Sequence, residues 1–195
     1  MFSNLVTYHI HQTSPLPANN AQAYQYVLSA NGLFVRAETR FWQACLLVAA
    51  CEVRGLQPLQ PWFRLKTGRL PASLLATAVA DARQQRRDGG GLNEALYQFR
   101  VDGRQVRLVR PVQQATASRV QTRQPPPPDL LLELHSHGKI PAYWSATDNR
   151  DEQGACLYGV MGRLDGRPQV RLRVGVYGYW QELPLTAVFG VKEER

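Results

Sequence analysis

Cysteine is scarce in this chain of 195 residues, which contains only Cys45, Cys51 and Cys156. The count is odd, and no two cysteines form a CxxC pair. Disulfide-dependent secreted domains contain more cysteine, and zinc sites built from cysteine use closely spaced pairs. The sequence therefore supports neither a disulfide framework nor a cysteine zinc site, and we expect buried free thiols.

Long apolar runs are also absent. No stretch approaches the roughly 20 consecutive apolar residues that a membrane-spanning helix requires. Residues 1–5 contain no basic region followed by an apolar one, so we expect no secretory signal. Together these absences favour a soluble, cytoplasmic protein.

Lysine is rare, and the formal net charge of +8 comes almost entirely from arginine. Such a charge is compatible with a nucleic-acid partner. The arginines are scattered along the chain, however, except for a cluster at Arg83, Arg86 and Arg87 that we expect at the end of a helix. The charge alone therefore gives only weak support to nucleic-acid binding.

The first 65 residues differ from the rest, and we predict that residues 1–65 form an N-terminal accessory region. A lead-in rich in proline and asparagine precedes a short strand around residues 33–36 and an apolar helix near residues 38–51. Gly55 and the prolines that follow it then break the chain. We predict a second domain over residues 66–195.

The second domain shows the patterns of an α/β (α+β) fold. Apolar residues recur at helical spacing in PASLLATAVADARQQ, residues 71–85. The dipeptide Asp102-Gly103 joins two alternating segments as a β-hairpin, and DLLLELH is apolar enough for a central strand. Further strands meet at a second Asp-Gly pair, residues 165–166. We expect a sheet flanked by helices, with the aperiodic residues 111–128 as an extended or mobile connection.

Two of the four histidines stand one residue apart in the segment LELHSHGKIPAYWSATD. Residues two apart in a strand point to the same side, so His135 and His137 can present both imidazoles to one point. A catalytic zinc ion takes three protein ligands and leaves one position open. Asp148 follows far enough along the sequence for a loop and the start of a helix to place its carboxylate next to the histidines. Ser145 precedes it by three residues, as in a capping box.

These residues form the pattern H-S-H, seven residues, serine, two residues, aspartate. The pattern resembles the JAMM signature of the JAB/MPN (Mov34/PAD-1) metallopeptidases, H-[ST]-H-x7-S-x2-D. Fixed residues at fixed offsets are more specific than an isolated H-x-H pair. The resemblance implies an MPN/JAB-like mixed sheet flanked by helices, and zinc as the cofactor of residues 66–195.

The same resemblance implies a role for each residue. His135, His137 and Asp148 would be the zinc ligands, and Ser145 would hydrogen-bond the oxyanion of the tetrahedral intermediate. The family also has a glutamate on an earlier strand, after the first helix, that acts as the general base. Glu94, in LNEALYQF, occupies that place in the order of elements.

Other glutamates compete for the role of general base. Glu133 lies on the ligand side of its strand but roughly 7 Å further back, and it is the second choice. Glu38 and Glu52 precede the first helix of the expected domain. Glu152 follows the aspartate closely, and we expect it in a solvated turn.

Longer segments, among them YQYVLSANGLFVRAE and RLRVGVYGYW, resemble the PRTRC system protein A family. Its members are bacterial JAB-type proteins encoded beside a ThiF/E1-like protein, a ParB-related protein and a small ubiquitin-like protein. The resemblance implies an extended peptide or a ubiquitin-like tail as the substrate, and the ThiF/E1-like and ubiquitin-like proteins as partners. Gly138 is a departure, because many peptidases of the wider family have proline after the second histidine.

We therefore predict a JAMM-type zinc metallopeptidase or isopeptidase that uses water and forms no covalent intermediate. Two alternatives stay open: a non-catalytic MPN-type scaffold, and a nucleic-acid-associated factor of a plasmid-type cassette. Tyr143 and Trp144 either line a groove for a peptide or pack the loop against the core. A second H-x-H pair, His9 and His11, lacks an accompanying acid and serine, and we expect both residues to be exposed.

Overall fold

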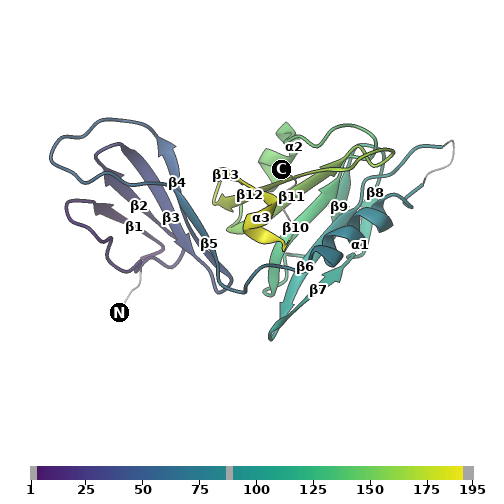
Figure 1. Cartoon of the computed structure of the whole chain (residues 1–195), viewed down its shortest axis with the longest axis horizontal. Helices are drawn as coiled ribbons and strands as arrows, with labels where there is room; N and C mark the ends of the chain where they lie inside the picture. Colours follow the sequence, from purple (N-terminus) through teal and green to yellow (C-terminus); the bar gives the residue numbers. More distant parts are fainter. Residues whose placement is uncertain (1–3, 87–89, 191–195) are drawn as a thin grey trace. The chain divides into compact units, whose positions relative to one another are not determined.

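The computed structural model describes residues 4–86 and 90–190 (Figure 1). The chain divides into two compact units. The first comprises Met1–Thr67, Gln153–Ala155 and Val174–Gln181, and the second comprises Gly68–Glu152, Cys156–Arg173 and Glu182–Arg195. The division into a region of residues 1–65 and a domain of residues 66–195 remains a prediction.

A five-stranded sheet dominates the first unit, in the order β1-β2-β3-β4-β5. Its strands are β1 (Val6–Ile10), β2 (Tyr24–Ser29), β3 (Gly32–Glu38), β4 (Trp42–Ala49) and β5 (Trp62–Leu65). β1 runs parallel to β2, and the other neighbours are antiparallel. Val27, Phe34 and Cys45 form a small core on one face, against which Leu16 and Leu59 pack.

The helix predicted near residues 38–51 is wrong, because this segment contains strand β4. The predicted strand around residues 33–36 is confirmed and lies within β3. β4 pairs with β3 on one side and with β5 on the other. An apolar run as short as WQACLLVA does not distinguish a buried strand from a buried helix by periodicity, so pairing with two neighbours decides the outcome.

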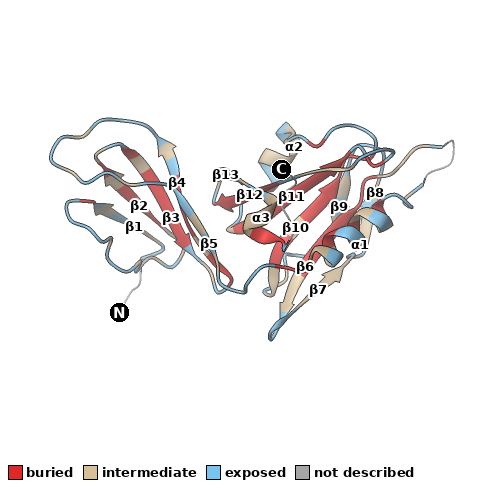
Figure 2. Ribbon diagram, in the orientation of Figure 1, coloured by how far each residue is buried: buried red, intermediate tan, exposed pale blue. Residues whose placement is uncertain are grey.

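A six-stranded mixed sheet is the main sheet of the second unit, in the order β13-β12-β11-β10-β6-β7, although residues 174–181 of β12 and β13 are assigned to the first unit. Its strands are β6 (Leu96–Asp102), β7 (Gln105–Val109), β10 (Leu130–Ser136), β11 (Cys156–Gly162), β12 (Gln169–Val176) and β13 (Tyr179–Leu183). β10 is central, parallel to β11 and antiparallel to β6, and Figure 2 shows these strands as largely buried. The predicted hairpin, the buried strand and the later strands are confirmed.

Three helices accompany this sheet in the described part of the chain: α1 (Ala72–Ala82), α2 (Ala146–Asp151) and α3 (Leu185–Val188). α1 confirms the predicted helix, and Asp81 at its end accepts a hydrogen bond from the hydroxyl of Tyr97 on β6 at 2.7 Å. Arg83 and Arg86 follow this helix and are exposed, whereas Arg87 lies outside the described residues. No helix within residues 4–86 and 90–190 is both long and apolar enough to cross a membrane. The predicted α+β class, a mixed sheet flanked by helices, is confirmed.

The connection predicted over residues 111–128 is more ordered than expected. It contains a short hairpin of β8 (Gln113–Ala115) and β9 (Val120–Thr122). The amide oxygen of the Gln113 side chain accepts from the backbone N–H of Leu96, and the Thr116 carbonyl accepts from the N–H of Glu94. These hydrogen bonds to a distant segment, rather than an apolar pattern, hold the hairpin in place.

Candidate metal centre

Strand β10 and the turn after it position the two histidines. His135 pairs with Val160 of β11 and with Leu96 of β6, and the N–H of His137 donates to the carbonyl of Met161 at 2.7 Å. Both side chains are buried. Because they are two residues apart in extended chain, they share one side of the sheet.

Ser136, between the histidines, points the other way and is fully buried. Its hydroxyl accepts from the N–H of Ala95 at 2.9 Å, and its own N–H donates to the carbonyl of Ala95 at 2.9 Å. The histidines are therefore fastened on both sides, to β11 and to the segment that leads into β6.

A capping box at the start of α2 orients Asp148. The Ser145 hydroxyl accepts from the N–H of Asp148 at 3.1 Å, and the N–H of Ser145 donates to the Asp148 carboxylate at 2.7 Å. The carboxylate is thus oriented by its own helix start, as the S-A-T-D sequence predicts.

The loop that leads to this helix is held close to β11. A Cβ atom at Gly162 would lie 2.3 Å from the carbonyl oxygen of Ile140 and 2.5 Å from the nitrogen of Ala142. The N–H of Arg163 donates to the same Ile140 carbonyl at 2.8 Å. Only glycine at position 162 permits this close approach of β11 to the loop. The approach holds the loop between His137 and α2 against β11.

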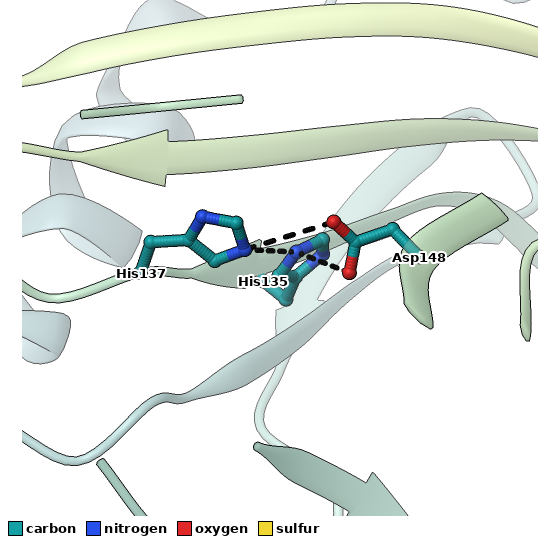
Figure 3. A group of neighbouring side chains, drawn as sticks. All are labelled: His135, His137 and Asp148. Atoms are coloured by element: carbon teal, nitrogen blue, oxygen red, sulfur yellow. Dashed lines mark hydrogen bonds and ion pairs between the residues drawn. The ribbon is translucent and has the colours of Figure 1, made fainter. Parts of the chain in front are cut away.

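The donor atoms of His135, His137 and Asp148 converge on one point (Figure 3). The two Nε2 atoms lie 3.1 Å apart. The Asp148 oxygens lie 3.2 Å from Nε2 of His135 and 3.7 Å from Nε2 of His137. Two ligands, each about 2.1 Å from a tetrahedral zinc ion, are about 3.4 Å apart. The donor set and its spacing therefore suit one zinc ion.

In the metal-free protein, the electrostatics of His137 and Asp148 favour the forms that bind a metal, whereas those of His135 favour its protonated form. Burial and the neighbouring His135 lower the pKa of His137 to about 4, so its imidazole is neutral at pH 7. Burial opposes ionisation of Asp148, but hydrogen bonds from His135 and Ser145 outweigh it and hold the carboxyl pKa well below its usual range. Burial alone would lower the pKa of His135, yet the Asp148 carboxylate raises it. Metal binding requires neutral imidazole and an ionised carboxylate.

Glu94 lies beside the histidines, two residues before β6 begins. His135 is opposite Leu96, and Ser136 is bonded to Ala95, so the next pair in the same register places Glu94 opposite His137. Directly opposite residues share a face, which directs the Glu94 carboxylate to the ligand side. Its side chain is buried, and burial raises its pKa to about 7.

The competing glutamates have other surroundings. Glu133 is opposite Gln98 in the pairing of β10 with β6, and burial raises the pKa of its carboxyl while a hydrogen bond with Gln98 opposes this shift. Glu38 pairs with Lys66 at 2.5 Å, and Glu52 is exposed in the first unit. Glu94 is the one of these that the strand register brings to the histidines.

The prediction of a solvated turn at Glu152 is wrong. This residue ends α2 with only 6% of its surface exposed. One carboxylate oxygen accepts from Nε of Arg173 on β12 at 2.8 Å, and the other lies 3.8 Å from Nδ1 of His135. Sequence reasoning missed both residues, although the spacing of four between Asp148 and Glu152 places them on the same side of a helix.

The two aromatic residues of the loop differ in their contacts. The ring of Tyr143 packs edge-on against His137 at 4.8 Å between centroids, yet 45% of the residue is exposed. Trp144 donates to the Glu182 carboxylate at 3.0 Å, and the guanidinium of Arg173 lies 4.0 Å from its ring centroid. Trp144 therefore packs the loop onto the sheet, whereas Tyr143 presents an exposed aromatic surface next to the candidate ligands.

The second histidine pair is not exposed as predicted. His11 is 2% exposed, and His9 is half-buried on β1. Both lie in the first unit, so they belong to a different unit from the candidate metal centre.

Comparison with known proteins identifies a family for part of the chain. A family model described as prokaryotic homologs of the JAB domain matches residues 74–174, slightly more than half of the chain. A search of the curated proteins found no match. Among solved structures, the chain is similar to the solution structure of protein DSY2949 from Desulfitobacterium hafniense, at 19% identity and a TM-score of 0.43; the similarity covers 65% of this chain and 93% of that one.

The residues that match the family model include most of α1, the central strand β10 and helix α2. They also include the three candidate ligands and Glu94. The chain therefore belongs to the family of prokaryotic homologs of the JAB domain.

Proposed function

We propose that this chain is a zinc-dependent metallopeptidase or isopeptidase of the JAMM type. The observation that carries the proposal is the convergence of three donor atoms at separations of 3.1 to 3.7 Å, a spacing suited to one tetrahedral zinc ion. A buried carboxylate, Glu94, stands beside this group on the neighbouring segment. A metal site next to a separate base is what hydrolysis by water requires.

A bound zinc ion would polarise the scissile carbonyl and make water acidic enough to lose a proton near pH 7. Glu94 is suited to receive that proton, because burial raises its pKa to about 7. A base whose pKa lies near the working pH can take a proton from water and return it to the leaving amine.

Ser145 is proposed to stabilise the oxyanion. Its oxygen already accepts from the N–H of Asp148, but a hydroxyl keeps its own hydrogen for donation. Because α2 and the loop fix the serine, the donor is oriented before the reaction begins. One such donor typically contributes a factor of about 10² to 10³ in rate.

The proposed substrate is an extended peptide or the tail of a ubiquitin-like protein, joined through a peptide or isopeptide bond. The exposed ring of Tyr143 beside His137 supports a chain that passes over the site. The resemblance to PRTRC system protein A supports a ubiquitin-like protein and a ThiF/E1-like protein of the same cassette as partners.

Metal content and turnover, measured on the same variants, test the proposal. Purified protein should contain about one zinc ion per chain, and His137→Ala should lose it. Glu94→Gln should keep the metal and lose cleavage of a ubiquitin-like protein fused to a reporter chain. Glu133→Gln is the matched control and should retain both.

The outcomes separate the competing functions. A protein that binds zinc but never cleaves such fusions would favour a non-catalytic scaffold. DNA binding that depends steeply on salt and is unaffected by chelation would favour a nucleic-acid-associated factor. A wild-type rate in Glu94→Gln would show that another group is the base.

A further inference from the structure

The first unit contains a cavity of about 800 Å³ that none of the residues of the candidate metal centre lines. Strands β3, β4 and β5 contribute polar and aromatic side chains to it, and residues 14–19 together with Pro58 and Leu59 contribute mostly apolar ones. We propose that this cavity binds a small organic anion, a carboxylate or phosphate carried on an apolar body.

Arg36 lies near the middle of a row that crosses the sheet. The register pairs Thr7 with Gln25, Gln25 with Arg36, Arg36 with Cys45, and Cys45 with Trp62. Directly paired residues share a face, so these five side chains lie on one side of the sheet. Because Phe34 is two residues before Arg36, the same side carries the small apolar core.

The guanidinium of Arg36 is buried without a carboxylate partner among the described residues. Only 6% of the residue is exposed, and its Nε donates to the side-chain oxygen of Gln25 at 2.7 Å. Its Nη2 is buried with no hydrogen-bond partner within residues 4–86 and 90–190. The Glu38 carboxylate also lines the cavity, but it is paired with Lys66.

Gln25 is itself held in place as the acceptor for Arg36. Its amide nitrogen donates to the Thr7 hydroxyl at 2.8 Å and lies 3.4 Å from the side-chain oxygen of Asn20. The amide therefore presents its oxygen to the guanidinium but supplies no negative charge. Buried charges in proteins are normally paired, since an unpaired one costs several kcal/mol. An anion from solution would complete this arrangement.

His11, Arg64 and the apolar part of the lining favour the same kind of ligand. His11 is 2% exposed, and its Nδ1 lacks a hydrogen-bond partner within the described residues. Arg64 adds a second guanidinium at the wall of the cavity. Trp62 and the prolines of residues 14–19 add apolar surface. Cationic groups and an apolar wall together suit an anionic head on an apolar body.

The chemistry and size set the class of ligand. A guanidinium binds the two oxygens of a carboxylate or a phosphate side by side, which a halide ion cannot reproduce. Cavities of about 300 to 1,000 Å³ hold small organic molecules. Benzoate and phenyl phosphate are therefore suitable probes, and they distinguish a carboxylate head from a phosphate head.

The experiment titrates the full chain with benzoate, phenyl phosphate and inorganic phosphate at constant ionic strength. Calorimetry and thermal unfolding are measured together. We expect saturable binding of one aromatic probe with a rise in melting temperature, and tighter binding of that probe than of inorganic phosphate. Arg36→Met should weaken binding at least tenfold, Arg64→Gln should weaken it several-fold, and Arg54→Gln, an exposed arginine outside the cavity, should leave it unchanged.

Two further results decide the outcome. Methionine in place of a buried, unpaired arginine should leave the ligand-free protein folded and equally stable or more stable. If Arg36→Met does not fold, Arg36→Lys, which keeps the charge but loses the planar fork, should bind several-fold more weakly than wild type. The proposal would be overturned if neither aromatic probe binds saturably. It would also be overturned if the Arg36 and Arg64 variants bind a probe as tightly as wild type does.

Discussion

The carboxylate of Glu152 accepts a hydrogen bond from Nε of Arg173 at 2.8 Å, and both side chains are buried. This pair joins the end of α2 to strand β12. The second carboxylate oxygen lies 3.8 Å from Nδ1 of His135. The pair therefore lies on the side of this candidate zinc ligand that is opposite its Nε2 atom. Removal of either residue leaves the other buried without its ion-pair partner.

Glu152→Ala should destabilise the protein by about 3 to 5 kcal/mol, the usual effect of breaking a buried ion pair. The double variant Glu152→Ala, Arg173→Met should recover part of this loss, because no buried charge remains. Urea unfolding of metal-free protein measures both values. As a control, Arg107→Ala breaks an exposed pair with Asp102 and should change the free energy of unfolding by less than about 1 kcal/mol.

The stability of the metal-free protein should depend on pH through Glu94. Burial raises the pKa of this carboxyl to about 7, whereas an unfolded glutamate titrates near about 4.3. Between these values the folded protein holds a proton that the unfolded chain has lost, so stability falls as pH rises. Glu94→Gln removes this effect. The stability of the variant minus that of wild type should increase from about pH 5 to about pH 7 and then level off; a difference independent of pH contradicts the assigned shift.

Gly138→Ala should cost about 1 to 2 kcal/mol of stability. Gly138 has a φ of +58°, a left-handed conformation that is unfavourable for residues with a Cβ atom. The proline that the family resemblance leads one to expect after the second histidine could not adopt this φ at all. Thermal unfolding provides the measurement. Gly166→Ala is the control, since Gly166 lacks a positive φ and has open space around its Cβ position, and it should change stability by less than about 0.5 kcal/mol.

Ser145→Ala should separate two functions of one hydroxyl. Loss of the cap of α2 should destabilise the protein by about 1 kcal/mol. Loss of the proposed oxyanion donor should lower kcat by a factor of about 10² to 10³ without a matching loss of bound zinc. Ser145→Thr keeps both the acceptor and the donor, so it should stay close to wild type in stability. An alanine variant with unchanged kcat would leave only the capping role.

The sequence was sufficient for the parts of the site that depend on local spacing. The alternation of a strand places His135 and His137 on one side, and the capping box orients Asp148 three residues after Ser145. Strong periodicity likewise predicted helix α1, and the Asp-Gly pair at residues 102–103 predicted the β6–β7 turn.

Features that depend on distant partners were not predictable in this way. Strand β4 has an apolar run without a clear period, and only its pairing with β3 and β5 makes it a strand. Glu152 carries no sign in its own segment that Arg173, 21 residues later, removes it from solvent. The burial of His11 was likewise not predictable from its own segment, because it depends on chain segments far away along the sequence.

Helix α2 is only six residues long and buries none of them, so by itself it would not be stable in water. Its attachments to the rest of the unit include the contact of Asp148 with His135 and the pair formed by Glu152. Local opening of this helix would carry Asp148 away while both histidines stayed on the central strand. We therefore expect a metal bound at this site to exchange through local opening of this short helix, without global unfolding of the sheet.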